Sequence, residues 1–179
     1  EFMEFRPDYG PEVFCGIAKI DGFPVAIVGN RQGVYPDYPA YAEGAYPGVG
    51  GKHYREGLIK QGEFVTLCGR DNLPIIWLQD TTGIDVGDLA EEAELLGLGQ
   101  ALVYSIEQTD ISMMCIVLRK GQAAAHYIMC GPQANNNNAF TLGTVCSEIC
   151  VMHGETAAAA SYARRLIKED EAGNDITPV

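Results

Sequence analysis

The stretch "SMMCIVLRKGQAAAHYIMCG", residues 112–131, decides the fold class of this chain. Its first part, 112–119, is an almost continuous apolar run, which is typical of a strand buried in a parallel sheet. The basic pair Arg119-Lys120 and Gly121 then form a short turn, and small residues begin a helix directly behind it. A strand that passes through a short turn into a helix is the building block of α/β folds.

The same order of strand, turn and helix occurs elsewhere along the chain. "PIIWLQD" (74–80) predicts a buried strand, and the residues after "TTGIDVGD" predict a helix over 88–108 with an acidic first turn. The other predicted elements are two strands joined as a hairpin by "DGF" (13–20 and 24–30), an amphipathic helix (53–70), one or two short strands (139–152) and a last helix (153–170). This order predicts an α/β domain with a largely buried sheet and right-handed crossovers.

The composition is that of a globular protein, with 179 residues of which 47% are hydrophobic and 20% are charged. Acidic residues outnumber basic ones by 24 to 12, and the net charge of −12 argues against binding to nucleic acid or to anionic membrane surfaces. No apolar run approaches the ~20 residues of a membrane span, and the opening "EFMEFRPDYGPE" is unlike a signal peptide. Because both ends are abrupt, we expect a piece of a longer chain.

The six cysteines, at positions 15, 68, 115, 130, 146 and 150, are scattered, and several lie inside apolar runs. This pattern indicates reduced, buried thiols of a cytoplasmic protein and not a disulfide framework. The cysteines and histidines match no zinc spacing, so we expect no metal site. No serine lies in a G-x-S-x-G turn, so a Ser-His-Asp triad of the hydrolase type is not expected either.

Residues 31–52, "RQGVYPDYPAYAEGAYPGVGGK", are rich in Gly, Pro and Tyr and show no periodicity. A long segment without regular structure inside a compact domain is usually functional or forms an interface. The alternative is a passive surface loop whose tyrosines pack it onto the body of the domain.

Two strand-to-helix turns are candidate functional sites, because ligands of open α/β sheets collect at the carboxyl ends of strands. They are "WLQDTTGIDVGDL" (77–89) and "IVLRKGQAAAHYIM" (116–129). If the second helix begins near Ala123, the amides of its first turn lack intrahelical partners and favour negative charge. Alanine keeps this backbone accessible and favours negative φ, although the alanines could also just pack against the sheet. The asparagines at 135–138 are interpreted as an exposed turn.

Four motifs resemble the carboxyltransferase component of biotin-dependent carboxylases and decarboxylases. They are "FCGIAKIDGFPVAIVGNRQGV" (14–34), "NLPIIWLQDTTGIDVG" (72–87), "GQAAAHYIMCG" (121–131) and "EICVMHGETAAA" (148–159). They occur in the family's order and together cover nearly the whole chain. Four motifs in the right order are far more specific than any one of them.

The resemblance implies a crotonase-like fold, in which ββα units repeat along a superhelix. Residues 1–179 would be the C-terminal domain of a two-domain chain. This domain and the N-terminal domain of a dimer partner would form one active site in a homodimer or higher oligomer. The CoA thioester substrate would lie mostly on the N-terminal domain, and biotin, attached to a separate carrier subunit, would lie on this one.

Matched position by position, the small-residue turn places the amide donors of an oxyanion hole at Ala124 and Ala125. The other turn supplies a second wall from Gly83 and Ile84. Relatives have glycine at one or more of the alanine positions, which leaves open which amide faces biotin. The other residues expected to contact biotin are Gly121, Gln122, Ala123 and His126, and for His126 core packing is the alternative.

The alanine-rich turn and the segment 35–57 resemble the decarboxylase branch of this family in particular. That branch implies transfer of a carboxyl group from an acyl-CoA to biotin and a partnership with a sodium-pumping membrane subunit. It also implies a cytoplasmic domain that is held at the membrane by its partner subunits.

Two other functions fit the same residues. An enoyl-CoA hydratase or isomerase of the crotonase type would need a carboxylate beside its substrate, for which Glu91 or Glu92 are candidates, although a solvated helix start also explains both residues. A non-catalytic docking domain for the biotin carrier or the membrane subunit would suit the acidic surface and the Tyr/Pro/Gly segment. Dependence of turnover on biotin separates the hydratase from the carboxyltransferase.

Overall fold

The computed structural model describes residues 1–131 and 138–152 and, after these, residues 154, 157, 158, 161, 162, 165, 167, 171 and 173. The chain forms two compact units, Glu1–Ile149 and Cys150–Val179. The expected last helix (153–170) and the asparagines at 135–137 lie largely or wholly outside the described residues. In the part of the chain that is described, no helix is long and apolar enough to span a bilayer.

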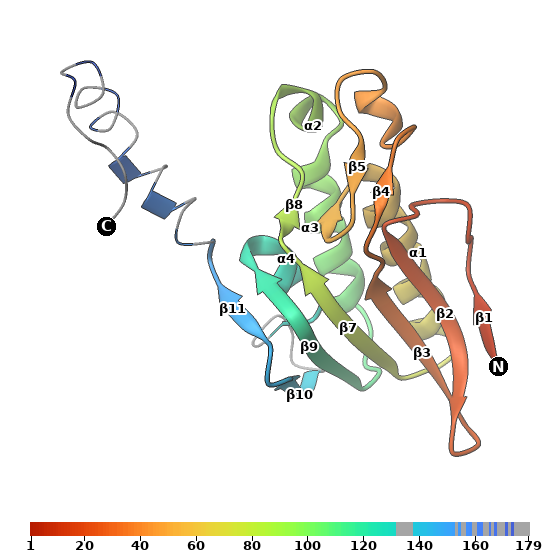
Figure 1. Ribbon diagram of the computed structural model, residues 1–179. Coiled ribbons are helices and arrows are strands. Elements are labelled where there is room, and N and C mark those ends of the chain that lie inside the picture. The colour runs from red at the N-terminus through yellow and green to blue at the C-terminus, as the bar shows by residue number, and fades with distance from the viewer. Residues whose placement is uncertain are drawn as a thin grey trace. The chain divides into compact units, whose positions relative to one another are not determined.

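A seven-stranded sheet forms the centre of the first unit (Figure 1). Its strands follow the order β1 (Phe2–Glu4), β2 (Val13–Ile20), β3 (Phe23–Asn30), β7 (Ile75–Thr81), β9 (Met113–Gln122) and β10 (Asn138–Gly143), with β11 (Glu148–Cys150) also paired to β9. β3, β7, β9 and β10 are parallel neighbours, whereas β1, β2 and β3 pair antiparallel. The mainly parallel α/β arrangement and the two short strands expected over 139–152 are confirmed.

The predicted hairpin between β2 and β3 is confirmed. β3 begins at Phe23, one residue before the predicted start of the second strand. Ile20 pairs with Phe23, so the loop consists of Asp21 and Gly22 alone. Both have positive φ, 49° and 83°. This is the conformation of a type I′ turn, whose twist matches that of the two strands.

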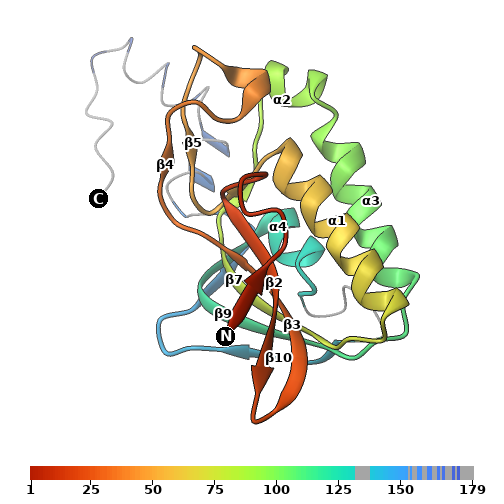
Figure 2. The same ribbon diagram turned by 90° about the vertical axis from the view of Figure 1, so that its right-hand side faces the viewer.

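Within residues 1–131 and 138–152 the structure describes four α-helices: α1 (Arg55–Arg70), α2 (Asp88–Glu92), α3 (Leu95–Glu107) and α4 (Ala123–Ile128). α1 and α3 lie side by side on one face of the sheet (Figure 2). The helix predicted over 53–70 begins two residues later, at Arg55. The single helix predicted over 88–108 is wrong, because Glu94 adopts a left-handed conformation (φ 61°) that separates α2 from α3.

Short strands between the long ones complete a repeated unit. β6 (Lys52–His53) and β8 (Gly83–Ile84) pair in parallel in a small sheet of their own. The chain therefore runs twice through a long strand, a short strand and a helix: β3, β6 and α1, then β7, β8 and α2–α3. This is the repeated ββα unit that the sequence predicts.

The core lies between the sheet and α1 and α3. Trp77 of β7, Leu58 of α1 and Leu102 of α3 are at most 1% exposed. Alternate residues of β7, such as Ile76 and Leu78, are only partly buried. In the described residues, helices cover one face of the expected largely buried sheet, and the other face is half-buried.

Candidate active site

The carboxyl end of β7 carries three consecutive polar residues. Gln79, Asp80 and Thr81 are 0%, 7% and 0% exposed, although they continue an apolar strand. Thr81 Oγ1 donates a hydrogen bond to the carbonyl oxygen of Gly51 (2.8 Å), and the N–H of Thr82 donates to the same oxygen (2.7 Å). Buried polar groups are costly unless they are hydrogen-bonded, so each of the three side chains binds a neighbouring segment firmly.

Gln79 holds the carboxyl-terminal part of α4. Its Nε2 donates to the carbonyl oxygens of His126 (3.0 Å) and Met129 (2.7 Å), and its Oε1 lies 2.6 Å from Nδ1 of His126. A carbonyl oxygen can only accept, so the orientation of the Gln79 amide is fixed and Oε1 must accept from a protonated Nδ1. Burial lowers the pKa of His126 and so favours the neutral ring. In the neutral form with Nδ1 protonated, the lone pair is on Nε2.

A bulge in β9 lies opposite Asp80. β7 and β9 pair residue for residue up to Gln79 and Val117, and the next pair is Thr81 with Gly121. One residue of β7 therefore faces three of β9. β-bulges bend a strand and redirect its side chains, and they are common next to active sites. This bulge directly precedes the small-residue turn.

The Asp80 carboxylate lies where the bulge interrupts the backbone pairing of β7 and β9. It accepts hydrogen bonds from the backbone N–H of Lys120 (3.3 Å), from Nε of Arg119 (2.8 Å) and from Nε2 of Gln32 (2.9 Å). The N–H of Asp80 in turn donates to Oδ1 of Asn30 (2.9 Å). The basic pair of the opening stretch thus fixes the end of β9 to β7.

The turn at β8 is fixed to the segment 31–52 by one buried carboxylate. Asp85 is 5% exposed and accepts from the hydroxyls of Tyr41 (2.9 Å) and Tyr46 (2.7 Å) and from Nζ of Lys52 (3.0 Å). Burial raises the pKa of Asp85, but the hydrogen bonds from Tyr46, Lys52 and Tyr41 outweigh burial and lower that pKa overall. Tyrosines therefore do pack this segment onto the domain.

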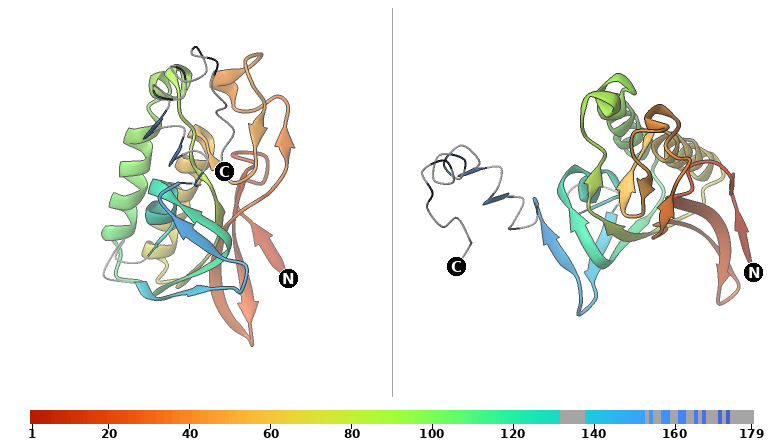
Figure 3. Two further views of the ribbon diagram at one scale, coloured as in Figure 1. Left: turned by 60° about the vertical axis from the view of Figure 1, so that its left-hand side comes forward. Right: turned by 45° about the horizontal axis from the view of Figure 1, so that its top comes forward.

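The segment is also more regular than its sequence suggests. It contains β4 (Val34–Tyr35), a 3₁₀ turn (Ala40–Ala42) and β5 (Gly48–Val49), which pairs with β4. Figure 3 shows this part of the chain, in orange, at the same end of the sheet as the green segment with β8 and α2. The segment therefore borders the carboxyl ends of the central strands.

We expect Asp85→Asn to destabilise the domain by about 2 kcal/mol, because three donors then lose a charged acceptor in a buried place. Tyr46→Phe should cost about 1 kcal/mol, since it removes one of the three hydrogen bonds. Urea unfolding of both variants measures these losses. Asp37→Asn, an exposed carboxylate of the same segment, is the matched control. Equal stability of Asp85→Asn and Asp37→Asn would contradict the role of Asp85 as the anchor.

Comparison with known proteins assigns the whole chain to one family. A family model described as a carboxyl transferase domain matches residues 1–178. The chain belongs to the carboxyl transferase domain family.

Curated relatives of this carboxyl transferase domain are much longer than the chain itself. Glutaconyl-CoA decarboxylase subunit alpha of Acidaminococcus fermentans is 57% identical over 178 residues, which are 99% of this chain and 30% of that protein. The methylcrotonoyl-CoA carboxylase beta chain of Dictyostelium discoideum is 27% identical over 88% of this chain and 23% of its own length. The chain thus spans less than a third of either relative.

Solved structures show the same fold. The beta subunit of geranyl-CoA carboxylase from P. aeruginosa superposes with a TM-score of 0.78 at 22% identity, over 94% of this chain and 29% of that one. The transcarboxylase 12S structure superposes with a TM-score of 0.75 at 22% identity, over 93% and 29% of the two chains. The expected crotonase-like fold is confirmed.

The carboxyl transferase domain brings its two predicted turns together, because α4 packs against β8. Gly83 has a φ of 145°, a conformation that glycine adopts without strain. No described atom lies within 4 Å of the place where a Cβ would be, so the space beside Gly83 is open. Its N–H donates to Oγ1 of Thr81 (3.4 Å). The side chain of Ile84 packs toward Gly99 of α3, so only the backbone of Ile84 can contribute to a site.

The helix of the small-residue turn begins at Ala123, as predicted. Ala123 and Ala124 are exposed and Ala125 is fully buried. The expectation that alanine keeps a negative φ here is wrong at Ala123, whose φ is 52°. The cause is local, because the chain must turn from the extended Gln122 into the helix within one residue.

Gly121 and Gln122, which are also predicted to contact biotin, are both buried. A Cβ on the buried Gly121 would lie 2.9 Å from Nδ1 of His126 and 3.3 Å from Oε1 of Gln79, so glycine makes room for this pair. Gln122 is 3% exposed, and its Nε2 has no hydrogen-bond partner among the described residues. A buried amide donor without a partner points to a ligand or a solvent molecule.

Gln79, Asp80 and Asp85 are the residues that sequence reasoning missed. The available signal is that polar residues continue an apolar strand at 79–81. Glu91 and Glu92, the carboxylates that a hydratase or isomerase would use, are exposed on α2. No observation therefore favours that alternative.

None of the six cysteines, all of which lie in the described residues, forms a disulfide. Four are buried, as expected, but Cys146 and Cys150 are exposed, so the expectation of buried thiols is wrong for these two. Cys146 lies between β10 and β11, and Cys150 is the last residue of β11. Within the described residues, no group of three or more His, Cys, Asp or Glu side chains is placed to hold a metal.

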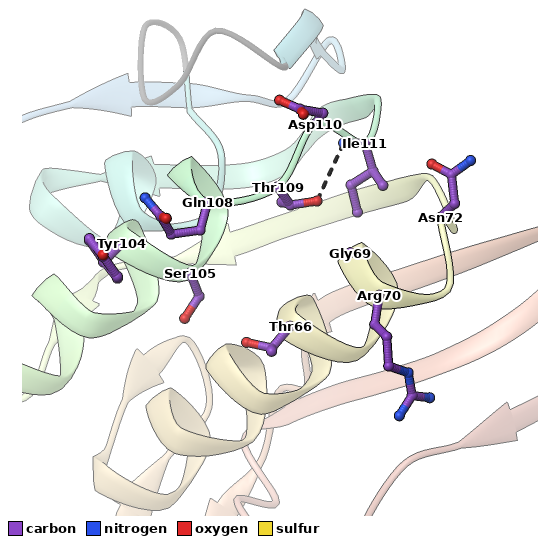
Figure 4. A pocket seen from close by; sticks show the side chains of 10 residues that line it. All are labelled: Thr66, Gly69, Arg70, Asn72, Tyr104, Ser105, Gln108, Thr109, Asp110 and Ile111. Atoms are coloured by element: carbon purple, nitrogen blue, oxygen red, sulfur yellow. Dashed lines mark hydrogen bonds between the residues drawn. The ribbon is translucent and has the colours of Figure 1, made fainter.

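A cavity of about 620 Å³ lies away from this site. It lies between the carboxyl-terminal ends of α1 and α3, and Figure 4 shows its lining, with Thr109 accepting a hydrogen bond from the N–H of Ile111 (3.3 Å). Asn72 and Ile111 of this lining precede β7 and β9. The cavity is therefore at the amino ends of the strands, whereas the two turns are at their carboxyl ends.

Proposed function

We propose that this domain is the biotin-side half of a carboxyltransferase that moves the carboxyl group of glutaconyl-CoA to biotin and forms crotonyl-CoA. The observation that carries the proposal is the contact of α4 with β8, which joins two turns with little side-chain bulk at the carboxyl ends of the strands. The choice of substrate is supported by the 57% identity with the alpha subunit of glutaconyl-CoA decarboxylase.

The chemistry explains why backbone amides would suffice. The carboxylate of glutaconyl-CoA can leave only if its electrons flow into the thioester as a dienolate. The ureido nitrogen of biotin is a poor nucleophile until negative charge builds on the ureido oxygen. Both partners therefore need preorganised hydrogen-bond donors aimed at developing oxyanions. Such a site requires no strongly basic side chain.

Ala124 and Ala125 are the proposed donors toward the ureido oxygen. Their N–H groups lie in the first turn of α4, where no intrahelical acceptor exists. Ala124 is exposed, so a ligand can reach its amide without displacing a side chain. Gly83 and Ile84 form the second wall through their backbone. The buried Nε2 of Gln122 supplies a further donor, and Gly121, Ala123 and His126 border the same turn.

Because this domain would form only the biotin side of the active site, the proposed function requires partners. A biotin carrier subunit brings biotin to this domain, and the remainder of the longer chain supplies the CoA side from a second protomer in a homodimer or higher oligomer. The transcarboxylase 12S structure is described as a hexamer assembly, which supports an oligomer. A sodium-pumping membrane subunit holds the enzyme at the cytoplasmic side of the membrane.

Replacement of Ala124 by phenylalanine tests the proposal. Because Ala124 is exposed, the variant should fold, but the bulky ring covers the first-turn amides. We expect carboxyl transfer from glutaconyl-CoA to free biotin to fall by roughly 10²–10³, as for the loss of an oxyanion donor. The full-length subunit is assayed, with Ala101→Phe, at an exposed alanine of α3, as the control. A folded Ala124→Phe protein with wild-type transfer rates would overturn the assignment.

Ala125 is a poorer position for this test. Its side chain is 0% exposed, so a larger residue there overpacks the core and costs about 1–3 kcal/mol by itself. Loss of activity in Ala125→Val would not distinguish a blocked amide from disturbed packing.

A further inference from the structure

The small-residue turn, residues 121–125, is attached to β7 at both of its ends. The N–H of Lys120, directly before the turn, donates a hydrogen bond to Oδ1 of Asp80 (3.3 Å). The carbonyl oxygen of His126, directly after the turn, accepts a hydrogen bond from Nε2 of Gln79 (3.0 Å). Asp80 and Gln79 are consecutive residues of one strand. The chain therefore has to change from strand to helix within residues 121–125 while both ends are held.

The two side chains that hold the turn are themselves fixed. Gln79 is 0% and Asp80 7% exposed. Oδ2 of Asp80 accepts hydrogen bonds from Nε (2.8 Å) and Nη2 (2.5 Å) of Arg119 and from Nε2 of Gln32 (2.9 Å), so the carboxylate cannot rotate without losing them. Hydrogen bonds to an ionised acceptor are stronger than neutral ones. Nε2 of Gln79 binds two carbonyl oxygens, which only accept, so its orientation is fixed as well.

Ala123 has a backbone conformation that alanine does not favour. It follows the extended Gln122 and has a φ of 52°. In the left-handed region the Cβ of an L-residue comes too close to the next carbonyl oxygen, and alanine has no polar side chain to compensate. Packing does not hold Ala123 in place, since the residue is exposed. Such a conformation persists only where the surrounding structure imposes it, and the attachments on either side of the turn do so.

From these contacts we propose that Asp80 and Gln79 are positioning residues for carboxyl transfer. They hold the beginning and the end of the turn and keep Ala123 left-handed, and they thereby set the direction of the N–H groups of Ala124 and Ala125. This role rests on the proposed carboxyltransferase function. It requires neither side chain to touch biotin or to move a proton.

Asp80→Ala in the full-length subunit with its biotin carrier tests the role. A displacement of about 1 Å in a site can cost ~10² in rate, so we expect kcat for carboxyl transfer to fall by roughly 10². The KM for glutaconyl-CoA should change by less than about threefold, because the turn is proposed to act on the biotin side. Asp71→Ala is the matched control and should keep the wild-type kcat. It also removes an aspartate that is paired with Nε and Nη2 of an arginine, Arg70 (2.7 and 2.9 Å), but before β7 begins.

Ala123→Gly supplies a readout that a general loss of stability would not give. Glycine adopts the left-handed conformation without strain, so it should partly replace the missing attachment. The penalty that alanine carries there corresponds to roughly 5–30-fold in an equilibrium. Ala123→Gly should therefore raise the kcat of Asp80→Ala by roughly 5–30-fold relative to its effect in the wild-type background. A wild-type kcat in Asp80→Ala, or an equal effect of Ala123→Gly in both backgrounds, would overturn the proposal.

Thermal unfolding tests the conformation of the turn without an activity assay and without an Asp80 variant. Ala124 is exposed like Ala123 but continues the helix, where glycine is destabilising. Ala123→Gly should therefore have a higher Tm than Ala124→Gly, and an equal or lower Tm would also contradict the proposal. If the wild-type enzyme transfers no carboxyl group to biotin, the proposed function fails. If it does and Asp80→Ala matches it, only the positioning role fails.

Discussion

Gly57→Ala is expected to destabilise the domain by about 3 kcal/mol, although alanine is the better helix former. Gly57 lies in the first turns of α1, and a Cβ there would overlap Oε1 of Glu12. Glu12 is 0% exposed, and the same Oε1 accepts a hydrogen bond from the N–H of Tyr54 (3.1 Å). The carboxyl group is fully buried, and the backbone of Gly10 also packs against Gly57. The added methyl therefore displaces a buried polar group from its hydrogen bond with the N–H of Tyr54.

Gly62→Ala is the matched control on the same helix. The nearest atom to its added Cβ is Oγ of Ser105, at an ordinary contact distance of 3.7 Å. This change should stabilise the domain by up to about 1 kcal/mol through helix propensity alone. Urea unfolding of both variants measures the difference.

A double-mutant cycle isolates the cause. Glu12→Ala removes the side chain that the new methyl meets, so Gly57→Ala should cost much less in a Glu12→Ala background. A coupling free energy of at least about 1 kcal/mol is expected for groups in contact. Additive effects would show that Gly57→Ala acts through the backbone and not through Glu12.

Much of the fold can be predicted from the sequence because its signals are local. Apolar runs of strand length, followed by segments of helical periodicity, are enough to predict β7, β9 and α1. A two-residue Asp-Gly turn is enough to predict the hairpin. The break at Glu94 cannot be read in this way, because a left-handed glutamate has no distinct sequence signal and depends on how α2 and α3 pack.

The candidate site likewise has one part that the sequence predicts and one part that it does not. The small-residue turn is a local feature and is visible in the sequence. The side chains that support the site are not, because their partners lie far away along the chain: Gln79 and His126 are 47 residues apart, Asp80 and Arg119 are 39 apart, and Tyr41 and Asp85 are 44 apart. Only the folded arrangement of β7 and β9 shows why a glutamine and two aspartates are placed there. The polar side chains would thus hold the site, while the backbone would carry out its chemistry.

Acid should destabilise the domain through His53. This residue is 0% exposed, with Nδ1 3.1 Å from Nε2 of Gln61 and Nε2 3.3 Å from Nδ2 of Asn30. Burial lowers the pKa of His53 to about 4. In the unfolded chain the pKa of His53 is near its ordinary value of ~6.5, so His53 binds a proton at a pH at which it is still neutral in the folded chain. The stability that His53 contributes is therefore lost as pH falls from about 6.5 to 4, by up to about 1.4 kcal/mol per pH unit.

Glu12 has the opposite effect over nearly the same range. Burial raises its pKa to about 7, although hydrogen bonds, including that from the N–H of Tyr54, lower it in part. The folded chain therefore keeps a proton that the unfolded chain, with an ordinary pKa of ~4.5, has released. This contribution to stability is lost as pH rises from about 4.5 to 7. Between pH 4.5 and 6.5 the contributions of Glu12 and His53 to the unfolding free energy change with pH in opposite directions. In the wild-type protein they therefore largely cancel.

Single substitutions should reveal the two opposing slopes. Relative to wild type, Glu12→Gln should become more stable with rising pH over 4.5–6.5, and His53→Gln should become less stable over the same range. Each slope should be about 1.4 kcal/mol per pH unit, with opposite signs. Urea unfolding of the three proteins at pH 4.5, 5.5 and 6.5 measures this, and the comparison with wild type cancels all other titrating groups. If the unfolding free energy depends on pH in the same way in all three proteins, then folding shifts neither the pKa of Glu12 nor that of His53.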